Sequence, residues 1–289
     1  YDTLLTEDAD VIKPDGDYLI RFRKKVFPTN LAREAYNGLR DAAVLTDNRG
    51  IAAGIPTEAL LKKKHAIRDG VRIRQIKADG TKGKRTRAKP VASGITGFFD
   101  RQGGAYPYCR LTSYNMNHAD KFKSAIPFIS RASIEFKRLM PDRYANQEAM
   151  IKKTDPDFFI KGSVFTTVTV NKNYRTACHK DAGDLKAGFG VMSCCEAGDY
   201  GGGYLVFPKF RCAVDLRSCD ILLADVGHEW HGNTKLEAIP HTFERISFVF
   251  YYRQHMIKCG SLVEELARAK ERYNSIPEIY GKEIPIERD

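Results

Sequence analysis

Hydrophobic residues along the chain follow two different periods, and the change between them falls near residue 161. Before that point, and again near the end, apolar residues recur every three or four positions, which is the spacing of amphipathic helices. Pro127 lies inside one of these segments and is expected to bend or interrupt its helix. The expected helices cover residues 31–44 (with Asn30 as N-cap), 119–139, 145–153 and 261–273.

After residue 161 the apolar residues form short alternating or continuous runs bounded by turns rich in Gly and Asp. Runs of this kind are typical of β-strands. They lie at residues 163–170, 190–195, 204–208, 212–216, 221–224 and 245–252. We therefore predict an α+β fold with an antiparallel sandwich or jelly-roll core, and helices packed on one face of it.

The residues that precede this β-rich part have a mixed character. Seven glycines lie between Gly70 and Gly104 in a polar context, which predicts a long loop. We expect a helical and basic-loop region over residues 1–118 that contacts DNA. A β core with supporting helices is expected over residues 119–289, and the two are expected to form one integrated domain.

Composition limits the class of protein. The 289 residues are 43% hydrophobic and 11% aromatic, so a sizeable core is available and wholesale disorder is excluded. The apolar runs 221–224 and 248–252 are far shorter than the ~20 residues of a membrane span, so no membrane partner is expected. The first residues lack the basic start and apolar stretch of a signal peptide.

Cysteine usage suggests a reducing compartment. None of the seven cysteines forms a Cys-x-x-Cys pair, so a structural zinc site is not expected. Most of them lie in apolar runs, where a free cysteine behaves as a small buried hydrophobe. We expect an intracellular protein, in the nucleus of a eukaryote or in the cytoplasm of a bacterial cell or of the host of a virus.

Positive charge is concentrated in one segment. The chain has a formal net charge of +11, and residues 62–89 contain twelve Lys or Arg against two Asp. Such density is the electrostatic footprint of a protein that binds a polyanion, above all nucleic acid. A solvated basic loop is the alternative. The residues expected to contact the DNA backbone are Lys82, Lys84, Arg85, Arg87 and Lys89.

His179 and Asp181 are the first part of a candidate metal site. Residues i and i+2 of a strand face the same side, so both side chains can converge on one ion. A distant histidine would complete the two-His, one-carboxylate face of non-haem Fe(II) oxygenases. His228, His231 and His241 compete for this role; His231 is favoured because it opens a turn after a strand. A hydrogen-bonded strand histidine is the alternative interpretation of His179.

Arg245 and Ser247 form a candidate anion site fourteen residues after His231. Both point to the same side of a strand, and a guanidinium can hold a carboxylate with two hydrogen bonds while the hydroxyl adds one. This is the chemistry that would hold the distal carboxylate of 2-oxoglutarate while its keto-acid end binds iron. Arg110 and Arg175 are candidates for the other carboxylate, with structural salt bridges as the alternative.

Several motifs resemble the TET/JBP family, Fe(II)- and 2-oxoglutarate-dependent oxygenases that oxidise the methyl group of pyrimidines in DNA. They are Cys178-His-Lys-Asp-Ala-Gly-Asp184, Gly201-Gly-Gly-Tyr-Leu-Val-Phe-Pro208, His231-Gly-Asn-Thr234, Arg245-Ile-Ser-Phe-Val-Phe-Tyr251 and, upstream, Cys109-Arg-Leu-Thr-Ser-Tyr-Asn115. The resemblance covers about half the chain and implies a double-stranded β-helix. It also implies Fe(II), 2-oxoglutarate and dioxygen, and a methylated pyrimidine flipped out of double-stranded DNA. The Cys-rich zinc-binding subdomain of the animal members is missing, as in the compact microbial and viral forms.

The resemblance also bears on which base is oxidised. Asp184 matches a base-contacting position, where a carboxylate would accept from the exocyclic amine of cytosine and repel the carbonyl of thymine; a turn residue is the alternative. Asn115 resembles another base- or cosubstrate-contacting position. Arg253 stands where animal members carry a base-contacting histidine, which leaves the base less certain. We expect a monomer that converts 5-methylcytosine to 5-hydroxymethylcytosine, with further oxidation open. The alternatives are thymine in DNA, a protein or small-molecule substrate, and a non-catalytic DNA-binding protein.

Overall fold

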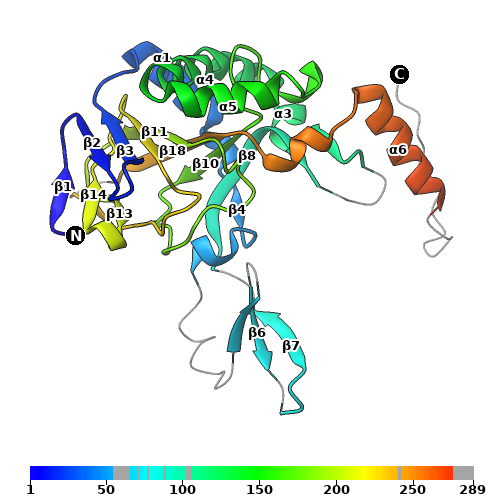
Figure 1. Ribbon diagram of the computed structural model, residues 1–289, viewed down its shortest axis with the longest axis horizontal. Helices are drawn as coiled ribbons and strands as arrows, with labels where there is room; N and C mark the ends of the chain where they lie inside the picture. Colours follow the sequence, from blue (N-terminus) through cyan, green and yellow to red (C-terminus); the bar gives the residue numbers. More distant parts are fainter. Residues whose placement is uncertain are drawn as a thin grey trace.

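The computed structural model describes residues 1–54, 66–69, 72–76, 78–86, 89–101, 106–239 and 242–275. Its largest element is a nine-stranded sheet, which forms one wall of the molecule (Figure 1). The strand order is β2 (Ala9–Ile12), β3 (Tyr18–Arg23), β15 (Ile221–Ala224), β11 (Gly190–Ala197), β18 (Glu244–Tyr251), β10 (Thr167–Lys172), β8 (Val91–Asp100) and β4 (Leu45–Thr46), with β9 (Cys109–Leu111) paired to β8.

A smaller sheet packs against one half of this wall. Its four strands, in order, are β1 (Thr3–Leu5), β14 (Cys212–Val214), β13 (Leu205–Phe207) and β16 (Gly232–Asn233). Apolar side chains of both sheets, among them Phe22, Leu222 and Phe207, meet in one buried cluster. Two further strands, β12 (Tyr200–Gly202) and β17 (Leu236–Ala238), form a separate two-stranded sheet. In the chain, β12 comes directly before β13, and β17 directly after β16. Two sheets face to face form the predicted jelly roll.

Helices cover the other face of the large sheet, as the sequence predicts (Figure 1). They are α1 (Thr29–Leu39), α4 (Ala119–Leu139) and α5 (Pro141–Ile151), with the short α3 (Ser113–Asn117) before α4. Phe248 and Phe250 of β18 are fully buried, and their ring centroids lie 5.5 and 6.0 Å from that of Phe128 in α4. Because side chains alternate along a strand, Arg245 and Ser247 point to the opposite face, into the roll.

The helices match their predicted segments, with corrections at α1 and α5. α4 runs without a break through Pro127; its buried face, which includes Phe128 and Ile129, offsets the lost hydrogen bond. Asn30 lies inside α1, whose N-cap is Pro28, and the helix ends at Leu39 before a 3₁₀ turn. α5 begins at Pro141, before the predicted start, because proline suits the first turn of a helix. α6 (Leu262–Ser275) agrees closely with the last predicted helix, residues 261–273.

The expectation of a long loop before residue 104 is wrong. Three strands, β5 (Ala66–Asp69), β6 (Arg72–Ile76) and β7 (Lys82–Thr86), form a sheet of their own that projects from the main body (Figure 1). Next comes β8, which pairs with β10 of the main sheet. Gly94 interrupts the apolar pattern of this strand. A side chain does not fit there, because a Cβ would lie 1.8 Å from the carbonyl oxygen of Ala42. The main sheet therefore extends across the boundary expected at residue 118.

Two of the cysteines are not free. Cys109 of β9 and Cys259, just before α6, form a disulfide with a Cα–Cα distance of 5.7 Å. They are 150 residues apart in sequence, so no local spacing could reveal the pair. The free thiols are those of Cys178, Cys194, Cys195, Cys212 and Cys219.

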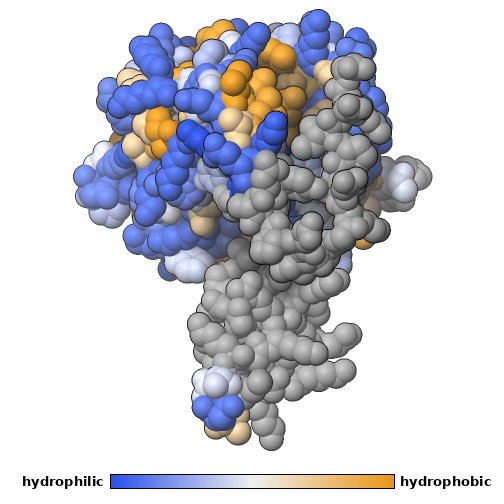
Figure 2. Space-filling view, turned by 90° about the vertical axis from the view of Figure 1, so that its right-hand side faces the viewer, coloured by the Kyte–Doolittle hydropathy of each residue, from blue (hydrophilic) through white to orange (hydrophobic). Residues whose placement is uncertain are grey.

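On the side drawn in Figure 2, hydrophilic side chains predominate among the described residues. Figure 2 shows one side of the molecule, where apolar residues gather mainly in one upper area among hydrophilic side chains. Among the residues that the structure describes, no helix has the length and apolar character needed to cross a membrane.

Candidate active site

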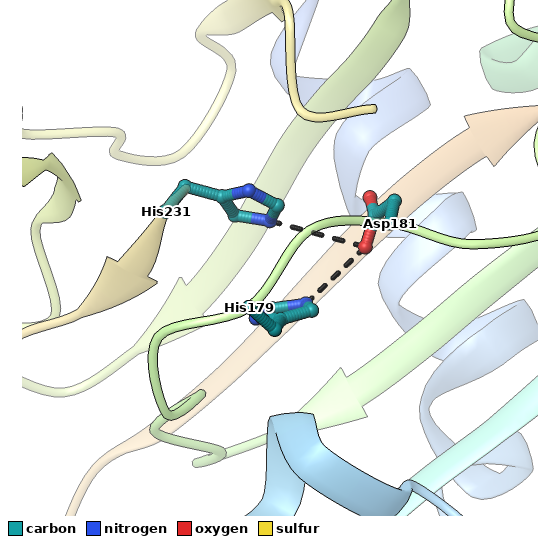
Figure 3. Close-up of side chains that lie close together, drawn as sticks. All are labelled: His179, Asp181 and His231. Carbon is teal, nitrogen blue, oxygen red and sulfur yellow. Dashed lines mark ion pairs between the residues drawn. The ribbon is translucent and has the colours of Figure 1, made fainter. Parts of the chain in front are cut away.

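The three predicted metal ligands converge. His179 and Asp181 lie in the segment between β10 and β11, and His231 comes directly before β16. Their side chains point toward one another (Figure 3), with His179 Nε2 3.2 Å and His231 Nε2 3.9 Å from Asp181 Oδ1. One ligand atom from each residue lies within 4.8 Å of the other two. The arrangement is the facial set of two imidazoles and one carboxylate that suits non-haem iron.

Main-chain hydrogen bonds hold the two histidines side by side. His179 N donates to His231 O at 2.8 Å, and His231 N donates to His179 O at 2.9 Å. This isolated antiparallel bridge leaves the ring centroids 4.4 Å apart. Gly232 permits the approach, because a Cβ there would lie 3.1 Å from the Cα and N of Cys178. The pairing of two backbone segments therefore sets the spacing of the ligands.

The same backbone fixes the protonation of both rings. Nδ1 of His179 lies 2.8 Å from Ala177 O, and Nδ1 of His231 lies 3.2 Å from Glu229 O. A carbonyl oxygen only accepts, so each neutral ring carries its proton on Nδ1 and turns the lone pair of Nε2 toward Asp181. These residues fit a divalent metal ion by the chemistry of their donor atoms.

Electrostatics favour the required charge states of two ligands and oppose that of the third. Burial acts to raise the pKa of Asp181, but the hydrogen bond from His179 and the charges of both histidines lower it, so Asp181 is ionised. Burial lowers the pKa of His231, which keeps that ring neutral. For His179, burial acts to lower the pKa, but Asp181 outweighs it and raises the pKa. A metal ion must displace a proton there as pH falls.

A cavity of about 270 Å³ opens beside the cluster. Asp181, Asp184 and Tyr251 line it, and the backbone of Asp184 pairs with that of Arg253 in a second isolated bridge. Burial, with a further contribution from the charge of Asp181, raises the pKa of Asp184 well above its ordinary range. Both effects favour the neutral form of Asp184 over what an exposed aspartate would show.

His228 lines this cavity but is not part of the metal cluster. Its Nδ1 lies 2.7 Å from Asp225 Oδ1, and its side chain is 51% exposed. His241, the other rival, lies outside the described residues. The preference for His231 among the three histidines agrees with this geometry.

Arg245 lies at the start of β18 and is only 6% exposed. Its Nε donates to Tyr200 Oη at 3.0 Å, and among the described residues no acceptor faces its two terminal nitrogens. Ser247 follows on the same inward face of the strand. A buried guanidinium with its terminal nitrogens available fits a carboxylate such as that of 2-oxoglutarate.

Arg110 and Arg175 make other contacts. The guanidinium of Arg110 lies 4.4 Å from the ring centroid of Phe99 and donates to Arg101 O at 2.8 Å. Nε of Arg175 donates to Asn233 O at 3.2 Å. These contacts support the local fold, and a role of either arginine in binding 2-oxoglutarate stays a prediction.

Asn115 and Arg253 also have structural partners. Asn115 Oδ1 accepts from Gly97 N at 2.8 Å, and this bond supports the point where β8 turns through a positive φ. Arg253 forms an ion pair with Asp100. The charge of Arg253 is thus balanced within the protein, whereas the side-chain amide nitrogen of Asn115 donates to no atom of the described residues.

The residues expected to bind the DNA backbone are only partly described. Lys82, Lys84 and Arg85 lie on β7, of which the backbone alone is described, and Lys89 is exposed just before β8. Arg87 lies outside the described residues.

Sequence reasoning missed residues that come close to the site only in the fold. Tyr200 contacts Arg245, and the hydroxyl of Tyr174 is buried without a hydrogen-bond partner. Arg49 donates to Gly94 O at 2.9 Å and has no carboxylate partner among the described residues. Of these three residues, Tyr200 alone had a feature in the sequence that could have indicated a role, namely its position in the glycine-rich run 198–203.

Comparison with known proteins decides the family. A family model described as the oxygenase domain of the 2OGFeDO superfamily, that of TET and JBP proteins, matches residues 94–254. The chain belongs to the TET/JBP family. Membership confirms the resemblance seen in the motifs, and the superfamily implies Fe(II) and 2-oxoglutarate, which the three ligands and Arg245 fit.

Curated relatives of this TET/JBP chain include thymine dioxygenases. JBP1 of Trypanosoma brucei brucei is 39% identical over 165 residues, which are 56% of this chain and 19% of the relative. JBP1 of Crithidia fasciculata is 31% identical over 229 residues, 78% of this chain and 28% of the relative. The chain thus spans less than a third of either relative's length.

A solved structure supports the fold. NgTET1 in complex with 5mC DNA superposes with a TM-score of 0.58 at 14% identity, covering 93% of this chain and 89% of that one. At this level of identity the likeness concerns the double-stranded β-helix alone.

Proposed function

We propose that this chain hydroxylates the methyl group of thymine in double-stranded DNA, with Fe(II), 2-oxoglutarate and dioxygen. The observation that carries the proposal is the convergence of His179, Asp181 and His231 beside a cavity, with both Nε2 atoms turned toward the carboxylate. The choice of thymine takes the place of 5-methylcytosine, which the sequence favoured.

Two considerations support thymine. The curated relatives that resemble this chain are named thymine dioxygenases. In addition, burial raises the pKa of Asp184, and a protonated carboxyl group can donate a hydrogen bond to a carbonyl such as O4 of thymine. The repulsion on which the preference for cytosine rested is then absent.

Each residue has a task in this reaction. His179, Asp181 and His231 would hold the metal, which when bound couples oxidation of 2-oxoglutarate to activation of dioxygen. Arg245 and Ser247 would hold the distal carboxylate, and the enclosed roll would exclude water from the reacting groups. Tyr251, on the same inward face of β18 and in the wall of the cavity, would border the flipped base. Flipping costs a few kcal/mol, which contacts in the cavity must offset.

5-Methylcytosine is the second candidate. An ionised Asp184 would accept a hydrogen bond from its exocyclic amine, and the charge of Arg253 acts to lower the pKa of Asp184. The choice between the two bases thus depends on whether Asp184 keeps its proton when the base is bound.

Nucleoside mass spectrometry of oxidised duplexes tests the proposal. The chain is incubated with Fe(II), 2-oxoglutarate and two matched duplexes, one with unmodified thymine and one with 5-methylcytosine at the same position. We expect 5-hydroxymethyluracil from the first and none with His179→Ala. Oxidation of 5-methylcytosine alone would support the second candidate, and succinate release that neither duplex stimulates would point to a protein or small-molecule substrate.

The role of DNA as partner has its own test. Replacing Lys82, Lys84 and Lys89 together by Glu should weaken duplex binding. It should also reduce the slope of log affinity against log salt by about 0.9 for each phosphate that the protein no longer neutralises. Lys152→Glu at the C-cap of α5, where Lys152 pairs with Glu148, is a single-site control of the same substitution type that should leave the slope unchanged. Equal effects of both changes would contradict a role for the basic segment.

A further inference from the structure

Arg245 is a buried cation with no carboxylate bonded to it directly. Glu196 of β11 is its cross-strand neighbour, directly opposite it in the register of β11 and β18. The hydroxyl of Tyr200 lies between the two side chains. Nε of Arg245 donates to Tyr200 Oη at 3.0 Å, and Tyr200 Oη donates to Glu196 Oε2 at 2.6 Å. The tyrosine therefore links the cation to its nearest negative charge.

Packing fixes the ring that carries this hydroxyl. The guanidinium of Arg217 lies 4.3 Å from the ring centroid of Tyr200, and the ring of Phe243 stacks at a centroid distance of 5.0 Å. Arg217 also donates to the carbonyl oxygen of Tyr200 at 3.3 Å. These contacts restrain the ring of Tyr200, whose hydroxyl bonds to Nε of Arg245.

Glu196 is fixed as well. Its Oε1 accepts from Ser218 N at 3.2 Å, and its own N donates to the hydroxyl of Ser218 at 2.9 Å. Burial raises the pKa of Tyr200, so the phenol keeps the proton that it donates to Glu196. The direction of every hydrogen bond from Arg245 to Glu196 is therefore determined.

This arrangement decides how Arg245 can bind a carboxylate. A guanidinium offers either its side edge, made of Nε and one terminal nitrogen, or its end, made of both terminal nitrogens. Tyr200 occupies Nε and so closes the side edge. The end, with its two terminal nitrogens, remains for a carboxylate.

We propose that Tyr200 is a positioning residue for the cosubstrate, which orients Arg245 so that its two terminal nitrogens receive the distal carboxylate of a five-carbon 2-oxo dicarboxylic acid. The proposal rests on the proposed function, since it assumes that 2-oxoglutarate binds at Arg245. Tyr200 acts through the arginine and touches neither substrate nor metal. A fixed guanidinium sets the distance from the metal to the distal carboxylate, so Tyr200 also contributes to selection by chain length.

Calorimetry on the full chain loaded with Mn(II) in place of Fe(II) tests this without catalysis. The dissociation constants of 2-oxoglutarate, oxaloacetate and 2-oxoadipate are measured for the wild type and for Tyr200→Phe, which keeps the ring and removes the hydroxyl. Tyr36→Phe is the matched control. Tyr36 donates to Glu244, the neighbour of Arg245, also at 2.6 Å, but from α1 on the opposite face of the sheet.

We expect Tyr200→Phe to bind 2-oxoglutarate about tenfold more weakly, as for the loss of one hydrogen bond to a charged group. Its preference for the five-carbon acid over the shorter and longer acids should also fall, and its Mn(II) affinity should not change. With Fe(II), the KM for 2-oxoglutarate should rise more than kcat falls. Tyr36→Phe should leave the affinity and the preference as in the wild type.

Three results would overturn the proposal. The first is an unchanged affinity and preference in Tyr200→Phe while the wild type binds 2-oxoglutarate. The second is an equal loss in both variants, which would mean general loosening of β18. The third is no binding of 2-oxoglutarate by the Mn(II)-loaded wild type, which would overturn the proposed function together with this inference. The first two results leave the proposed function intact.

Discussion

The metal cluster and the Arg245 subsite lie in the same roll but are held in different ways. At the cluster, the main chain does the holding: two reciprocal N–H to O bonds pair His179 with His231, and backbone carbonyls accept from both rings. At the subsite, side-chain hydrogen bonds from Arg245 to Tyr200 and from Tyr200 to Glu196 hold the arginine. Ligand spacing therefore depends on two backbone segments, and arginine orientation depends on a hydroxyl group that one substitution can remove.

The difference suggests a division of roles. A backbone bridge tolerates many changes in neighbouring side chains, which suits a metal site whose ligands must lie within a few tenths of an ångström of their places. A side-chain network can be altered one group at a time, which suits a subsite that selects among dicarboxylates. A change at the cluster should therefore alter metal affinity, and a change at the Arg245 subsite should alter cosubstrate affinity.

Loss of a ligand should have the largest effect. His231→Ala removes one of three ligands and should lower metal affinity by more than the 10- to 100-fold typical of changes behind the ligands. His228→Ala, which changes a partly exposed ring bonded to Asp225, should leave metal affinity within about threefold of the wild type. Titration with Mn(II) measures both. A greater loss in His228→Ala than in His231→Ala would reverse the assignment of the third ligand.

Arg245→Lys should affect the other region. Lysine keeps the charge but has no fork of donors and no Nε for Tyr200, so affinity for 2-oxoglutarate should fall about 10- to 100-fold. The affinity for Mn(II) should stay as in the wild type, because the cluster does not depend on this side chain. Calorimetry with the metal and then with 2-oxoglutarate separates the two effects; a parallel loss of metal affinity would contradict the independence of the two regions.

The sequence predicted the part of the site that local geometry controls. Arg245 and Ser247 lie on one regular strand, so strand periodicity sufficed to place that pair. His179 and Asp181 converge as expected from their spacing, but they lie between β10 and β11, where, of the two, only His179 forms an isolated bridge. Tyr200 is 45 residues from Arg245, in the short strand β12, and its ring packs against Arg217 and Phe243. No spacing rule carries that information.

The same reason explains the main errors about the fold. β8 contains Gly94, which interrupts the apolar pattern because the backbone of Ala42 occupies the space of a side chain. The raised pKa of Asp184 could not be derived from the sequence either, because a spacing gives no measure of burial. Elements with an unbroken apolar run or a regular apolar period, by contrast, follow from their own residues, as β15 and α4 show.

Gly232→Ala should test the backbone bridge directly. The new Cβ would lie 3.1 Å from Cys178, tighter than an ordinary contact, so the two segments must move apart. We expect the free energy of unfolding to fall by ~1–3 kcal/mol, with weaker metal binding. Gly227→Ala is the control, since no atom lies within 4 Å of its Cβ position. Chemical denaturation measures both, and equal stability of the two variants would mean that the bridge tolerates a wider spacing.

Tyr174→Phe should have the smallest effect on stability, and its sign is informative. The hydroxyl of Tyr174 is buried without a partner, so removing it relieves an unsatisfied polar group and should leave stability unchanged or raise it by up to ~1 kcal/mol. Tyr252→Phe is the contrast, because its hydroxyl lies 2.7 Å from Thr154 Oγ1 and its loss should cost ~1 kcal/mol. Chemical denaturation of both variants, with and without 2-oxoglutarate, measures these changes in the free energy of unfolding. If Tyr174→Phe is neutral alone but loses stabilisation by the ligand, the free hydroxyl belongs to the cosubstrate subsite, and side chains from outside β18 take part in holding the ligand.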